Sequence, residues 1–67
     1  MTFGDRLREI RESKGLYPKQ VAPLIHVSVP TYCTYEADTT TPSIDRCGKI
    51  CRALDIEPEE LFKGVEL

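Results

Sequence analysis

The chain has 67 residues, enough for one small domain and too few for two, so we treat residues 1–67 as a single domain. Hydrophobic residues make up 40% of it, and no stretch approaches the ~18 apolar residues of a membrane span, so we expect no membrane partner. The N-terminal segment carries Asp5, Glu9 and Glu12 and lacks the apolar core of a signal peptide, which predicts a cytoplasmic protein. The net charge of −2 is unusual for a nucleic-acid-binding domain, which normally has a basic surface.

The first predicted helix covers residues 2–14. Thr2 and Asp5 have the spacing of a capping box, in which the two side chains satisfy backbone N–H groups at the start of a helix. Gly15 follows the last turn, where a left-handed residue ends a helix at little cost. The apolar stripe of this helix comprises Phe3, Leu7 and Ile10.

The next two helices are predicted at residues 18–25 and 29–36. Pro23 lies inside the first of them and removes a backbone donor, so we expect that helix to be short or bent. Ser28 is a typical N-cap for the second. His26 lies in the turn between them, and we interpret it as a left-handed turn residue.

A polar loop at residues 37–42 precedes two further helices, at residues 44–54 and 59–62. Ser43 caps the first of these, and Pro58 opens the second. No segment alternates like a strand, so the fold class is all-α with five short helices. The predicted core consists of Phe3, Leu7, Ile10, Val21, Ile25, Val27, Tyr32, Tyr35, Ile44, Cys47, Ile50, Cys51, Leu54 and Leu61.

The composition offers little for catalysis or metal binding. Cys33, Cys47 and Cys51 are an odd set without a Cys-x-x-Cys pair, which disfavours a disulfide framework and a zinc finger. We interpret them as small apolar side chains. With one histidine, no paired carboxylates at the end of a strand and no glycine-rich phosphate loop, we expect no enzyme, no metal and no cofactor.

The order of particular residues is more specific than the helix pattern. It includes the run from Gly4 to Leu16, Val21-Ala22, Ile25, Val27-Ser28, Thr31-Tyr32, Tyr35-Glu36, Pro42-Ser43-Ile44, Ile50, Ala53-Leu54-Asp55-Ile56 and Glu60-Leu61-Phe62. This pattern resembles the Cro/C1-type (XRE-like) helix-turn-helix family over nearly the whole chain and without a gap. The resemblance implies a five-helix, lambda-repressor-like domain. It also implies a transcriptional regulator, in particular a repressor, that binds operator DNA as a dimer with its third helix in the major groove.

The resemblance further implies that Arg11, late in the first helix, pairs with Glu36 at the end of the third. Such a pair would lock the third helix against the first. The positions implied to face DNA are Tyr17, Lys19, Ser28, Val29, Pro30, Thr31, Cys33, Thr34, Thr39 and Thr40. The positions expected at a dimer interface are Leu61, Phe62, Val65 and Leu67.

The expected DNA face departs from the family in its charge. Residues 16–43 contain a single base, Lys19, beside Glu36 and Asp38. Where relatives often carry glutamine, arginine or asparagine to contact purine edges, this chain has Val29 and Pro30. A second hypothesis therefore stays open, in which DNA binding is weak or lost and the domain acts as a protein-interaction module or antitoxin-like partner.

Overall fold

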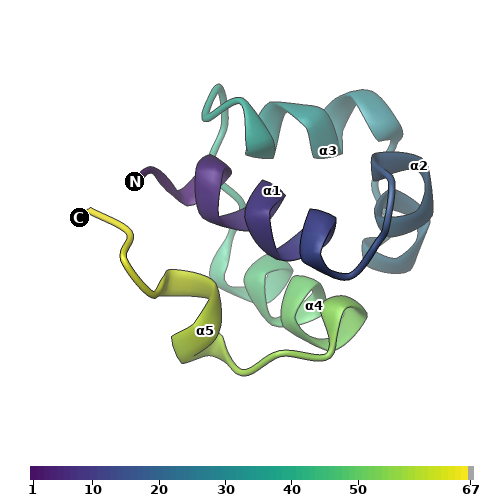
Figure 1. The fold of residues 1–67 in the computed structure, drawn as a ribbon. Helices are drawn as coiled ribbons and strands as arrows, with labels where there is room; N and C mark the ends of the chain where they lie inside the picture. Colours follow the sequence, from purple (N-terminus) through teal and green to yellow (C-terminus); the bar gives the residue numbers. More distant parts are fainter. Residues whose placement is uncertain (67) are drawn as a thin grey trace.

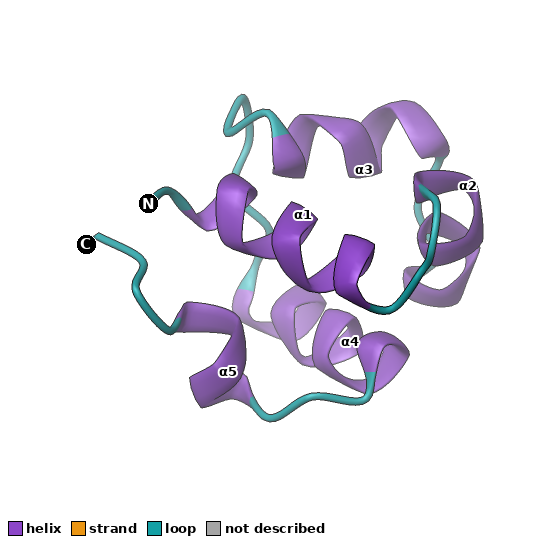
Figure 2. Ribbon diagram, viewed as in Figure 1, coloured by secondary structure: helices purple, strands orange, loops and turns teal. Residues whose placement is uncertain are grey.

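The computed structural model describes residues 1–66, and every regular element in that part of the chain is helical (Figures 1 and 2). The elements are α1 (Phe3–Ser13), α2 (Pro18–Val21), the 3-10 helix η1 (Ala22–Ile25), α3 (Val29–Glu36), α4 (Ile44–Leu54) and α5 (Pro58–Phe62). The all-α prediction is confirmed. A membrane crossing would need a longer apolar helix than any found in residues 1–66.

The helices begin and end where local chemistry predicts. The Thr2 hydroxyl accepts from the Asp5 N–H at 3.1 Å, and the Asp5 carboxylate accepts from the Thr2 N–H at 3.3 Å, which completes the expected capping box of α1. The hydroxyl of Ser28 caps α3 and that of Ser43 caps α4. Because each cap depends on three or four consecutive residues, the sequence was sufficient to find it.

The segment after Gly15 bends as predicted. Gly15 has φ +71°, and the chain then enters α2 with Pro18 at its first position. Pro23 cannot donate to the carbonyl one turn before it, so the α-helix ends at Val21 and continues as the tighter η1. His26 then takes the left-handed conformation, with φ +60°.

The core lies between all the helices, from α1 to α5 and including η1. In Figure 1, α1 runs through the middle of the molecule, with α3 on one side and α4 and α5 on the other. The fully or nearly buried residues of the core are Leu7, Ile10, Val21, Ala22, Ile25, Tyr32, Tyr35, Ile50, Cys51, Leu54 and Leu61. Phe3, Val27 and Cys47, also predicted as core, are partly buried at its edge.

One prediction about the core and one about the dimer interface are wrong. Ile44 was expected in the core but is 93% exposed, because it is the first residue of α4 and helical side chains tilt toward the N-terminus, here beyond the neighbouring helices. Leu61 is fully buried, as the core prediction had it, so it has no exposed area for the dimer interface at which it was also expected. Leu67 lies outside the described residues.

Candidate nucleic-acid interface

The third helix is fixed to the first by an ion pair. Arg11 Nε donates to Glu36 Oε2 at 2.6 Å, and Arg11 Nη2 donates to Glu36 Oε1 at 3.0 Å. Both side chains are about nine-tenths buried, and Nη1 donates to the Leu16 carbonyl at 2.8 Å. The hydrogen bonds to the Glu36 carboxylate raise the pKa of Arg11. The pair implied by the family resemblance is therefore present, in bidentate form.

A close backbone approach supports the same junction. The Gly4 N–H donates to Asp38 Oδ1 at 2.9 Å, and a Cβ on Gly4 would overlap the carbonyl oxygen of Glu36. Asp38 itself has φ +60°, a conformation that Asp, Asn and Gly adopt most readily. Sequence reasoning missed this contact because nothing local to Gly4 indicates that the end of α3 lies against it.

The outward side of α3 carries the residues expected to face DNA. Tyr32 and Tyr35 point inward and are buried, which leaves the other side of the helix free. At its start Ser28, Pro30 and Thr31 are exposed, and Val29 is 39% exposed. Farther along the chain, Cys33, Thr39 and Thr40 are exposed and Thr34 is half-buried.

The first turn of α2 lies beside this surface. Tyr17, Pro18, Lys19, Val29 and Cys33 line a shallow hollow of about 310 Å³ between α2 and α3. The Lys19 ammonium lies 5.9 Å from the centre of the Tyr17 ring. The structure thus brings together four residues that were predicted for the DNA face and that lie up to 16 positions apart in the sequence.

Two supporting residues of the interface were not predicted. Gln20 Oε1 accepts from the Tyr17 N–H at 2.8 Å and so caps α2, a role that a glutamine three residues into a helix could have indicated. Arg46 Nη1 donates to the Ile25 carbonyl at 3.0 Å and thereby fixes the end of η1 to α4. No sequence signal marks the second contact, because it joins residues that only the packing of α4 brings together.

A second surface lies at the end of the molecule where α3 ends and both chain termini are found (Figure 1). A groove of about 580 Å³ is lined there by residues that include Phe3, Pro42, Ile44, Cys47, Phe62 and Val65. The Phe3 and Phe62 rings pack in a tilted arrangement at a centroid distance of 5.8 Å, and Phe62 is still 43% exposed. We call this surface the Ile44 groove.

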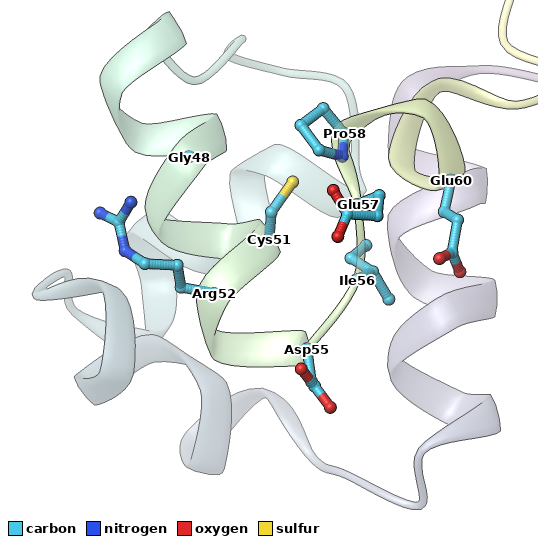
Figure 3. A pocket seen from close by; sticks show the side chains of 8 residues that line it. All are labelled: Gly48, Cys51, Arg52, Asp55, Ile56, Glu57, Pro58 and Glu60. Carbon is cyan, nitrogen blue, oxygen red and sulfur yellow. The ribbon is translucent and has the colours of Figure 1, made fainter.

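A third hollow, of about 440 Å³, lies between α4 and α5 (Figure 3). The carboxylates of Asp55, Glu57 and Glu60 surround it, with Arg52 as the one base in its lining. Burial raises the pKa of the Cys51 thiol, which borders this hollow. Because an acidic lining repels a polyanion such as DNA, we do not include this hollow in the candidate nucleic-acid interface.

The fold and the locked, outward-facing α3 define a helix-turn-helix domain. The helix-turn-helix family model matches residues 7–61, and the chain belongs to this family, as the Cro/C1-type resemblance predicted.

Among known proteins, the chain is similar to the HTH-type transcriptional regulator DdrOP3 of Deinococcus deserti, with 33% identity over 98% of this chain and 51% of the relative. It is also similar to the SPbeta prophage-derived uncharacterized HTH-type transcriptional regulator YonR of Bacillus subtilis, with 29% identity over 92% of this chain and 57% of the relative. The chain therefore spans about half the length of these curated relatives.

A solved structure extends the likeness to three dimensions. The restriction-modification controller protein C.AhdI from Aeromonas hydrophila superposes with a TM-score of 0.85 at 40% identity, over 90% of this chain and 91% of the other. The five-helix, lambda-repressor-like architecture predicted from the sequence agrees with this match.

Proposed function

We propose that this chain is a sequence-specific DNA-binding transcriptional regulator that binds operator DNA as a homodimer, with α3 in the major groove. The observation that carries the proposal is the buried, bidentate Arg11–Glu36 pair, which holds α3 rigidly with one side turned outward. The three similar proteins described above are named as transcriptional regulators or as a controller protein, which supports the same function. Such a protein would act in the cytoplasm and would not be an enzyme.

We propose repression as the mode of regulation. A repressor acts by occupying a promoter, and DNA binding by a pair of these domains would achieve that. A reporter gene under the operator would give the sign of regulation, because repression lowers and activation raises its expression.

The low positive charge of the α2–α3 face predicts DNA binding that depends only weakly on salt concentration. Within residues 16–43 the one base is Lys19, so a dimer offers two such ammonium groups to phosphates. At ~0.9 per neutralised phosphate, log K should fall with log salt with a slope of about −1.8, far shallower than for repressors rich in Lys and Arg. Base discrimination would rest on contacts of Val29 and Pro30 with thymine methyl groups and on DNA shape.

We propose that the dimer forms through the Ile44 groove. Of the four interface residues expected from the sequence, Phe62 and Val65 line this groove. Ile44, at 93% exposure, adds a large apolar side chain that a second copy would cover. A domain of this size buries only ~60% of its unfolded surface, so additional burial between subunits would stabilise it.

The position of the Ile44 groove suits a two-fold axis. Because the groove lies at the C-terminal end of α3, a two-fold axis through it would turn the two α3 N-termini away from each other, on one face of the dimer. The subunit measures 26 × 23 × 21 Å, so two subunits side by side would have centres about 25 Å apart. Their outer α3 ends would lie farther apart, near the ~34 Å of one DNA turn.

Titration of fluorescent duplex from a randomised pool and from the chain's own upstream region, at low salt, tests the proposal. We expect salt-sensitive binding with a shallow slope, and Ile44→Glu should give a folded monomer with much weaker binding. Lys49→Glu, on the same helix and outside the groove lining, is the control and should remain dimeric. Failure of a folded dimer to bind any duplex would refute the DNA function.

The α2–α3 hollow favours a second candidate function, the capture of a protein partner. Tyr17, Val29 and Cys33 make this face apolar, with Lys19 as its one base. Val29→Arg distinguishes the two functions. On a DNA-binding face it raises non-specific affinity for duplex and weakens sequence preference, whereas on a protein-binding face it abolishes partner capture.

A further inference from the structure

Hydroxyl groups follow one side of α3 and continue into the next loop. Ser28, Thr31 and Thr34 are spaced by three residues, so their side chains are neighbours along the helix. Thr40 joins this series from the loop, with its hydroxyl oxygen 2.6 Å from that of Thr34. The loop is also held by its backbone, since the Thr39 N–H donates to the Thr34 carbonyl at 3.0 Å. We call these four residues the hydroxyl row.

The protons of the hydroxyl row can be assigned from its contacts. Each hydroxyl has one hydrogen to donate, and a carbonyl can only accept. The Thr34 hydroxyl lies 2.6 Å from the Thr31 carbonyl, so its hydrogen goes there, and Thr40 must be the donor in the contact between Thr34 and Thr40. Ser28 donates to the Thr31 hydroxyl at 2.9 Å. Within residues 1–66, Thr31 is thus the one member of the row whose proton has no partner.

From this assignment we propose that Thr34 presents only a hydrogen-bond acceptor to DNA, and therefore selects a base edge that donates. In the major groove the donors are the adenine N6 and cytosine N4 amino groups, whereas guanine O6 and thymine O4 only accept. Donation by Thr34 to an acceptor would forfeit its bond to the Thr31 carbonyl. The inference rests on the proposed function, since it names the base chemistry that the α3 face reads.

The same assignment gives different roles to the remaining hydroxyls. Thr31 keeps a free proton and is the member able to donate to a phosphate or a base acceptor. The Thr40 hydroxyl donates its hydrogen bond to Thr34, so it positions the loop against α3 and has no proton left for a phosphate. The row thus has one donor, near the start of α3, and an acceptor about one turn farther on.

The test uses duplexes that lack single amino groups. A duplex selected by the wild-type protein from a randomised pool is remade with purine in place of each adenine in turn, and with pyrimidin-2-one in place of each cytosine. We expect one such replacement in each half-site to weaken binding roughly three- to tenfold, the loss typical of one hydrogen bond. Thr34→Val should abolish that sensitivity, and Thr34→Ser, which keeps the hydroxyl, should retain it.

Thr40→Val is the matched control, because it leaves the Thr34 proton on the Thr31 carbonyl and should keep the amino-group sensitivity. If Thr34→Val retains the same sensitivity at every position, the inference is overturned while the DNA function stands. If the folded wild-type protein binds no duplex, the proposed function fails and the inference fails with it. Circular dichroism of each variant separates these outcomes from unfolding.

Discussion

Truncation of either partner of the Arg11–Glu36 pair should cost more stability than any other single change on the interface. The pair is about nine-tenths buried, so Arg11→Met leaves the Glu36 carboxylate without a cation, and Glu36→Met leaves the guanidinium without an anion. Stranding a buried charge costs about 3–5 kcal/mol. The whole domain is expected to be stable by only roughly 3–10 kcal/mol. At ~4–8 °C per kcal/mol, each single variant should melt at least ~12 °C lower.

The double variant separates coupling from simple loss. Arg11→Met with Glu36→Met removes both charges and should recover most of the stability, short of about 1 kcal/mol for the lost hydrogen bond to the Leu16 carbonyl. Urea unfolding followed by circular dichroism gives the four free energies. The control is Arg8→Met, whose partner Asp5 is 44% exposed, and which should change stability by less than about 1 kcal/mol. A double variant whose loss equals the sum of the singles would refute the coupling.

The remaining predictions test the packing and the burial of titratable groups. Gly4→Ala should lower the melting temperature, because the added Cβ would overlap the Glu36 carbonyl oxygen. Gly48→Ala is the comparison, because its Cβ would meet only the end of the flexible Arg52 side chain, and it should raise the free energy of unfolding by about 1 kcal/mol. The buried Tyr32 hydroxyl has no hydrogen-bond partner within residues 1–66. At pH 7, Tyr32→Phe should therefore leave the free energy of unfolding unchanged or raise it by about 1 kcal/mol. A decrease of more than about 1 kcal/mol would contradict this. Burial, and next the nearby carboxylate, raise the pKa of Tyr32, so wild-type stability should fall once pH exceeds the unfolded value of about 10, and fall less in the phenylalanine variant. In a thiol titration at neutral pH, exposed Cys33 should react first, because burial raises the pKa of the other two thiols; equal rates would contradict this.

Much of the fold and part of the site could be predicted from the sequence. The caps at Thr2, Ser28 and Ser43 and the left-handed turn at His26 are present as expected, because each depends on a few consecutive residues. The Arg11 pair required the family resemblance, since its two halves are 25 positions apart. Four of the positions expected to face DNA, Tyr17, Lys19, Val29 and Cys33, line one hollow, and whether any of the expected positions contacts DNA stays a prediction.

What the sequence by itself determined is the set of helices and the side of each that is apolar, because periodicity and capping are local properties. Only the tertiary structure decided which residues of each apolar stripe are buried by neighbouring helices and which stay exposed. Ile44 continues the stripe of α4 and yet is 93% exposed, on the open groove that it lines with Phe3 and Phe62. The contact of Gly4 with the end of α3 and the bond between Thr34 and Thr40 likewise depend on how helices and loops meet, and no local pattern encodes that meeting.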